Sequence, residues 1–249
     1  TEGGSVYVFN NDAGTGYYGV QNGIIWNESS IIRPTVKSNY DTFGSSIDMS
    51  GNYLIIGAIQ KDATENKGKA YMYYYENSNW VEKKILTADD GVNGDEFGYS
   101  VATNQEYAFV GAPNHDSNKG KVYIFKKNHL GNDNWGLIKK IQPTDIAVND
   151  YFGTAIAVNN HNAFLSSPGT TDTSGAVYYF SEKLDVWGVE VGGEWKENHK
   201  MGASDGENNN KFGISLSISN TIAVIGASLQ DISGNVDSGS AYIFYNTGE

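Results

Sequence analysis

With 249 residues, of which 39% are hydrophobic, the chain is long enough to bury a core without disulfides or structural metals. Its net charge of −12 excludes sequence-independent binding to nucleic acid, which relies on Lys and Arg at the phosphates. The absence of cysteine excludes thiol catalysis and cysteine-ligated zinc, and no apolar run approaches the roughly 18 residues that membrane insertion requires.

Four short patterns recur along the chain, and each predicts a β-strand because it is rich in β-branched and aromatic residues and bounded by turn residues. Phe-Gly pairs at 43–44, 97–98, 152–153 and 212–213 mark strand a, and an apolar run that ends in a small residue 14 positions after each Phe marks strand b. Strand c reads Gly-x-(Ala/Val)-Tyr-x-(Tyr/Phe), at 4–9, 68–73, 120–125, 175–180 and 239–244. Strand d carries a Trp followed five or six residues later by an aliphatic residue or Met, starting at Trp26, Trp80, Trp135 and Trp195.

The constant step from a to b requires a short hairpin, for which residues 49–52, 103–106, 158–161 and 218–221 are suited. Four antiparallel strands per repeat of about 55 residues predict an all-β fold, a β-propeller of four-stranded antiparallel blades. We expect one domain, 1–249, containing a partial repeat (1–40), three whole repeats (41–94, 95–149 and 150–209) and a second partial repeat (210–249).

The patterns give seventeen strands, with strands c and d before the first whole repeat and a, b and c after the last. A closed ring of four blades would need sixteen, with the Trp26 strand completing the last blade. Because the sequence starts and stops inside a repeat, we expect a segment of a larger propeller or repeat array.

The order Asp-x-Phe-Gly, small-residue corner and Gly-x-Val-Tyr-x-Phe resembles the FG-GAP repeat, most closely at residues 86–98 and 201–213. The resemblance implies a propeller like that of integrin alpha subunits and of bacterial, algal and viral surface proteins. Calcium-binding FG-GAP repeats place Asp-x-Asp-x-Asp-Gly in the a-to-b hairpin. This chain has Asp48 alone there, so no cofactor is expected, and calcium is not expected at those positions.

Signatures of catalysis are missing from the sequence. The four histidines, His115, His129, His161 and His199, fall in different blocks, and no nucleophile elbow or phosphate loop is present. The repeated tryptophans suit packing between blades. Trp187 lies outside the repeat, within an insertion at 185–195, and is a candidate for ligand contact. Asn27 begins a glycosylation sequon.

The Tyr of strand c and the aromatic residue two positions later should share one face and pack between blades, as for Tyr71/Tyr73, Tyr123/Phe125 and Tyr178/Phe180. The pairs Tyr7/Phe9, in the extra copy of strand c, and Tyr242/Phe244 follow the same rule.

The b-to-c and d-to-a connections should share one side of the molecule, where acidic residues gather. An Asp follows the corner in each repeat: Asp62, Asp116, Asp172 and Asp231. A second set, Asp41, Asp95 and Asp150 with Asn210, precedes Phe-Gly. These side chains either satisfy backbone N–H groups in turns or form a ring of carboxylates that attracts a basic partner or a divalent cation. Whether a metal binds is left open.

We expect a non-enzymatic binding, adhesion or structural module, extracellular or at a cell or virion surface, with a protein or glycan partner. The alternatives are a purely architectural repeat and a carbohydrate-active enzyme, either a polysaccharide lyase or a glycosidase, on a propeller scaffold.

Overall fold

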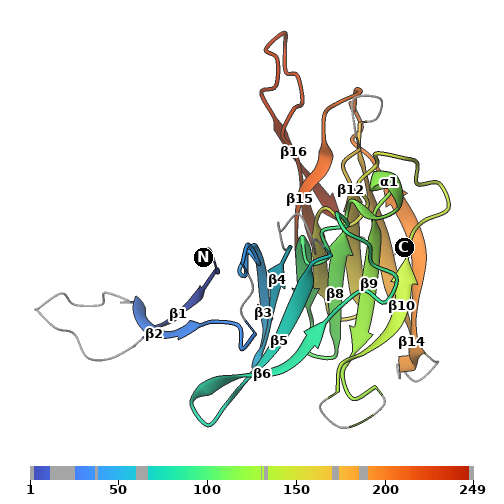
Figure 1. Cartoon of the computed structure of the whole chain (residues 1–249). Helices are drawn as coiled ribbons and strands as arrows, with labels where there is room; N and C mark the ends of the chain where they lie inside the picture. Colours follow the sequence, from blue (N-terminus) through green and yellow to red (C-terminus); the bar gives the residue numbers. More distant parts are fainter. Residues whose placement is uncertain are drawn as a thin grey trace, which may run out of the picture.

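A computed structural model of the chain describes residues 3–11, 26–36, 39–59, 67–129, 131, 134–169, 174–184 and 190–246. Within these residues the strands form five antiparallel sheets, which follow one another along the chain and contain two, four, four, four and three strands. Figure 1 shows them as an open row with the first sheet at one end. The prediction of an all-β fold of four-stranded antiparallel sheets is confirmed.

Strands within each sheet are consecutive in sequence and occur in the predicted order. The first sheet contains strands c and d, β1 (Val6–Asn11) and β2 (Trp26–Ile32). The second contains β3 (Ser46–Ser50), β4 (Tyr53–Ala58), β5 (Lys69–Glu76) and β6 (Asn79–Leu86). The third contains β7 (Ser100–Thr103), β8 (Tyr107–Ala112), β9 (Lys121–Lys126) and β10 (Gly136–Ile141). The fourth contains β11 (Ile156–Asn159), β12 (Asn162–Ser167), β13 (Ala176–Leu184) and β14 (Glu190–Met201). The fifth contains strands a to c, β15 (Phe212–Ser219), β16 (Ile222–Ala227) and β17 (Ser240–Tyr245).

Each a-to-b hairpin turns within the predicted stretch. Residues 51 and 52 alone separate β3 from β4, and Gly51 adopts a φ of 56°. Asn160 and Asn220 take the same place in the fourth and fifth sheets, with φ values of 50° and 52°. Glycine and asparagine adopt this left-handed conformation more readily than other residues, which explains their position.

The glycine that opens strand c forms the joint between one sheet and the next. Gly68 and Gly120 form parallel bridges to Phe97 and Phe152, the Phe of the following Phe-Gly pair. A Cβ atom on Gly120 would lie 2.0 Å from the carbonyl oxygen of Phe152, and Gly120 also has a φ of 84°. Only glycine fits this joint, because any side chain would separate the two sheets.

The corner after strand b keeps its pairing in the fourth sheet although the sequence changes there. In the third sheet Ser100 lies opposite Gly111, and its Oγ donates a hydrogen bond to the carbonyl of Gly153 at 2.6 Å. In the fourth sheet Ala155 stands in the place of Ser100, and Ser166 in the place of Gly111. The Oγ of Ser166 accepts the N–H of Ala155 at 2.8 Å. The two hydroxyls therefore make different contacts: that of Ser100 bonds to the next sheet, whereas that of Ser166 bonds to the paired strand of its own sheet.

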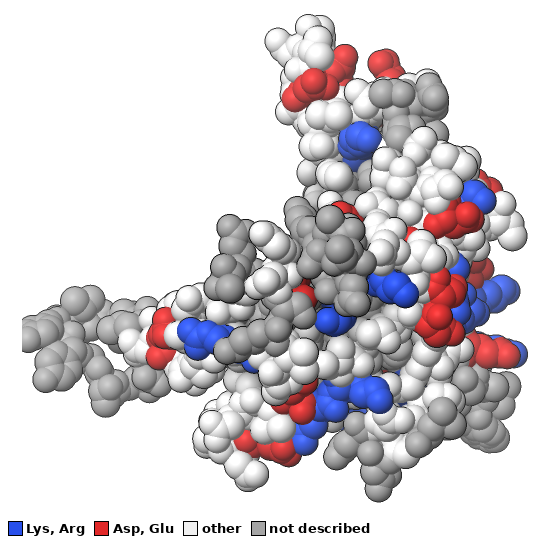
Figure 2. Space-filling model, viewed as in Figure 1, with Lys and Arg blue, Asp and Glu red and all other residues white. Residues whose placement is uncertain are grey.

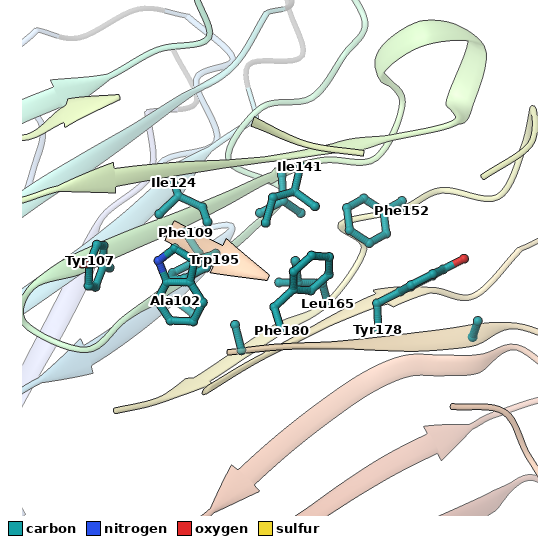
Figure 3. Packing of buried hydrophobic residues seen from close by; sticks show 13 residues of the cluster. Ala102, Tyr107, Phe109, Ile124, Ile141, Phe152, Leu165, Tyr178, Phe180 and Trp195 are labelled. Carbon is teal, nitrogen blue, oxygen red and sulfur yellow. The ribbon is translucent and has the colours of Figure 1, made fainter. Parts of the chain in front are cut away.

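Hydrophobic cores lie between consecutive sheets. The interface between the third and fourth sheets buries, among others, Phe109, Phe152, Leu165, Tyr178 and Trp195 (Figure 3). The predicted strand c pairs are buried in the second, third and fourth sheets, namely Tyr71/Tyr73, Tyr123/Phe125 and Tyr178/Phe180. The predicted register of these three sheets is therefore confirmed. The pair Tyr242/Phe244 of the fifth sheet is partly buried against the fourth.

In the first sheet the aromatic pair of strand c is exposed and not buried. Tyr7 and Phe9 are 53% and 49% exposed, whereas Val6, on the other face of β1, is buried against the second sheet. The described part of the chain contains no sheet before β1 for this aromatic face to pack on, so the prediction that Tyr7 and Phe9 are buried is wrong. The one helical segment described, α1 (His115–Asn118), is a single irregular turn. No described helix has the length and apolar character to cross a membrane.

Candidate functional site

Of the four aspartates predicted to follow strand b, the structure describes two, Asp116 and Asp231. Both lie in b-to-c connections, on the side of the molecule that also carries the d-to-a connections. Asp116 is exposed in α1, and its Oδ2 pairs with Lys119 Nζ at 3.0 Å. That hydrogen bond to Lys119 holds the pKa of Asp116 below its usual range. Asp231 accepts the backbone N–H of Asp237 at 2.8 Å within the β16–β17 connection. Asp62, Asp172 and Trp187 lie outside the described residues.

Two of the aspartates that lie two residues before the Phe of Phe-Gly, Asp95 and Asp150, form turns. The carboxylates of Asp95 and Asp150 accept backbone N–H groups three residues upstream, of Val92 at 2.9 Å and of Ala147 at 2.8 Å. Asp95 is buried and also contacts His115 Nδ1 at 2.7 Å. These contacts favour the turn-forming interpretation for these two residues.

Three other aspartates on this side were missed by sequence reasoning. They lie seven residues before the Phe of Phe-Gly, and each accepts the hydroxyl of the strand c tyrosine of the sheet that follows it: Asp90 with Tyr123 at 2.7 Å, Asp145 with Tyr178 at 3.0 Å, and Asp205 with Tyr242 at 2.7 Å. Their constant distance from the Phe-Gly pair is the signal that could have found them. Val36 occupies that place before Phe43.

Lysines from strand d complete two of these pairs. Lys140 lies 3.2 Å from Asp90, and Lys200 lies 2.6 Å from Asp145. Burial alone would raise the pKa of Asp90, but hydrogen bonds from Tyr123, Lys121 and Lys140 outweigh it and hold the pKa below its ordinary value. Burial and then the Asp205 hydrogen bond raise the pKa of Tyr242 to about 12. Positive charge is thus interspersed with the acid (Figure 2).

A pocket of about 510 Å³ opens on the same side, between the loops of the fourth and fifth sheets. Its lining is mostly polar and includes Asp150, Ser167, Lys200 and Asn208. Lysine and hydroxyl donors beside a carboxylate suit a ligand that both donates and accepts hydrogen bonds, such as a sugar or a peptide.

Within the described residues, no three His, Asp or Glu side chains converge as metal ligands. Asp48, the aspartate close to the β3–β4 hairpin, accepts the N–H of Thr103 at 2.7 Å. Burial raises the pKa of Asp48, and the Thr103 hydrogen bond offsets part of that rise. This carboxylate thus joins the second sheet to the third.

Glu182 is a buried acid on the opposite side of the sheets. Its carboxylate accepts the hydroxyl of Tyr107 and lies 3.0 Å from His161 Nδ1. Because Tyr107 belongs to the third sheet and Glu182 to the fourth, this network links two sheets.

Comparison with known proteins identifies the repeat. The FG-GAP repeat model matches residues 26–73, 80–125, 135–180 and 195–244, so each matched unit runs from strand d to strand c. Among solved structures, Sqt1 from Chaetomium thermophilum is similar, with a TM-score of 0.50 and 12% identity over 84% of this chain and 45% of that chain. A GH43 endo-arabinanase from Bacillus licheniformis matches with a TM-score of 0.40 and 14% identity over 98% of this chain and 91% of that chain. No curated protein matches the chain. At this identity the likeness to Sqt1 shows the propeller-like fold alone.

Proposed function

Because the chain belongs to the FG-GAP repeat family, we propose that it is a non-enzymatic binding or adhesion module, displayed outside the cell or on a virion, that recognises a protein or glycan. Recognition would use the b-to-c and d-to-a loops, with the sheets as a rigid scaffold. The polar pocket beside Lys200 lies among these loops and offers a recess for part of the ligand.

The turn at 116–118 is the observation that carries this proposal. Asp116, Ser117 and Asn118 are consecutive and all left-handed, with φ values of 51°, 60° and 63°. Such residues cost of order 1 kcal/mol or more each and concentrate at ligand-binding and active sites. Asp95 anchors the turn through His115, and the Asn118 side chain donates to Asn149 Oδ1 at 2.9 Å. The fold thus holds Asp116 and Ser117 exposed in a fixed conformation.

A glycan array probed with the intact chain tests this function. We expect saturable binding to one glycan class, reduced at least tenfold by Asp116→Asn because the carboxylate would be lost from the ligand. Glu106→Gln is the matched control, since Glu106 is an exposed acid paired with Lys127 at 3.4 Å on the opposite side. Unchanged glycan binding by the Asp116→Asn variant would show that the turn at 116–118 is not part of the binding site.

Release of reducing or unsaturated ends from the same glycans would instead support the alternative, a glycosidase or polysaccharide lyase. If no glycan binds, immobilised extracellular matrix proteins provide the second panel, with the same two variants. Failure of both panels would favour a purely architectural repeat.

A further inference from the structure

The pocket of about 510 Å³ beside Lys200 lies where the fourth sheet has shorter side chains than the third. Strand c pairs with strand d in the same register in both sheets, because Val122 lies opposite Ile141 and Val177 lies opposite Met201. Positions in the two sheets can therefore be compared in space as well as in sequence. Three positions that line the pocket differ, with Lys119, Lys121 and Gln142 in the third sheet and Ser174, Ala176 and Gly202 in the fourth.

The most informative of these differences is the loss of the glutamine. In the third sheet Gln142 Nε2 donates a hydrogen bond to the carbonyl oxygen of Gly120 at 2.9 Å. In the fourth sheet Gly202 has no side chain, and among the described residues no side chain donates to the carbonyl oxygen of Gly175, the counterpart of Gly120. Because Gly175 and Gly202 both line the pocket, it leaves the place of an amide group free beside a carbonyl acceptor.

The rest of the lining combines an apolar spot with hydrogen-bonding groups. Ala176 and Met201 are 8% and 9% exposed and supply the apolar spot. Asp150, Ser167 and the exposed Asn208 supply a carboxylate, a hydroxyl and an amide. The carbonyl of Asp150 accepts the Ser167 hydroxyl at 2.8 Å, which holds these two residues together. A ligand that fits this lining carries an amide with a methyl group at one point and hydroxyl groups elsewhere.

We propose that this pocket binds a 2-acetamido sugar, an N-acetylhexosamine unit of a glycan. Its acetamide N–H would donate to the Gly175 carbonyl, in the place that the Gln142 amide takes in the third sheet. Its methyl group would pack on Ala176 and Met201, and its ring hydroxyls would bond with Asp150. The inference rests on the glycan binding proposed above and names the class of glycan.

The size of the pocket favours a sugar over the side-chain amide of a protein partner. A volume of about 510 Å³ lies in the range of small-molecule sites and is large enough for a monosaccharide ring. A Gln or Asn side chain would fill only the part next to Gly175 and would leave Asp150 and Asn208 without a ligand group.

An NMR titration of the intact chain with methyl glycosides tests the pocket. We expect saturable shifts of the Gly175 and Ala176 amide signals with the glycosides of N-acetylglucosamine or N-acetylgalactosamine. The methyl glycosides of glucose and galactose, which lack the acetamide, should bind at least about tenfold more weakly, because the Gly175 carbonyl would stay unpaired.

Gly202→Gln would restore the side chain that the third sheet carries. A Cβ atom at Gly202 would meet no atom within 4 Å, so the backbone accepts the change. The new amide should occupy the acetamide position and weaken binding of the acetamido sugars at least about tenfold. Thr87→Gln is the matched control and should leave the affinity unchanged, since Thr87 is the exposed residue at the same position of the second sheet. Equal unfolding temperatures check that both variants fold.

Equal binding of the sugars with and without the acetamide, absence of shifts at Gly175 and Ala176, or unchanged affinity in Gly202→Gln would overturn the proposal. Tighter binding of a Gly-Gln-Gly peptide would overturn the choice of a sugar. Asp116 does not line this pocket, so Asp116→Asn tests the proposed function and Gly202→Gln tests the pocket. Binding of other glycans that Asp116→Asn weakens, without binding of acetamido sugars, would leave the proposed function standing and overturn this inference.

Discussion

Tyr71 differs from the equivalent tyrosines of the other repeats. Its hydroxyl is buried without a hydrogen-bond partner among the described residues, whereas Tyr178 donates to Asp145 at 3.0 Å. Removing a paired hydroxyl costs about 1 kcal/mol, whereas removing an unpaired buried one costs nothing or stabilises. We therefore expect Tyr178→Phe to lower the free energy of unfolding by about 1 kcal/mol and Tyr71→Phe to leave it unchanged or raise it, as measured by urea denaturation.

The substitution Val36→Asp would supply the hydrogen-bond acceptor that the Tyr71 hydroxyl lacks among the described residues. The new carboxylate would stand where Asp90, Asp145 and Asp205 stand in the other repeats and could accept the Tyr71 hydroxyl. We expect a gain of about 1 kcal/mol in the free energy of unfolding. The gain should disappear when Tyr71→Phe is combined with it, and a gain that persists in the double variant would contradict the assignment.

The hydrogen bonds to Asp90 should make the free energy of unfolding depend on pH in the acid range. Hydrogen bonds that outweigh burial hold the folded-state pKa of Asp90 below its ordinary value, so the stabilisation is present above the unfolded-state pKa and lost as the pH falls through the folded-state value. Asp90→Asn should cost about 1 kcal/mol at neutral pH, a figure discounted for solvent screening, and progressively less below about pH 4. Urea midpoints between pH 7 and 2 measure this, and an equal cost at all pH values would show that the charge has no role.

At the scale of elements, glycines form the joints between sheets. Gly120 combines a φ of 84° with a Cβ position 2.0 Å from a carbonyl oxygen, whereas Gly94 has a φ of 94° and open space around it. Gly94→Ala should therefore cost about 1 kcal/mol from backbone strain alone. Gly120→Ala should cost at least about 3 kcal/mol, because the sheets must also separate. Thermal unfolding of the two variants measures the difference, and equal losses would show that the inter-sheet contact adds nothing.

At the scale of the whole molecule, the open row predicts uneven stability. Sheets in an array are stabilised by their neighbours, and each sheet at an end has one neighbour fewer. The outer face of the first sheet exposes Tyr7 and Phe9, and the fifth sheet exposes Val224 and Ile243. We expect native-state hydrogen exchange to be fastest in β1, β2 and β15–β17 and slowest in β7–β9. Uniform protection would show that the end sheets are covered in solution.

The sequence by itself determined the strand order, the sheet size, the hairpin turns and the buried face of strand c in the second, third and fourth sheets. These features follow from the alternation of side chains along a strand, from glycine and asparagine at left-handed turns, and from the constant number of residues between the repeated patterns. Only the tertiary structure decided that Asp90 and Tyr123 meet, that the Ser166 hydroxyl bonds to Ala155, and that Trp135 is buried while Trp26 is exposed. Each of these outcomes depends on which neighbouring sheet or strand lies beside the residue, and local pattern does not encode that neighbour.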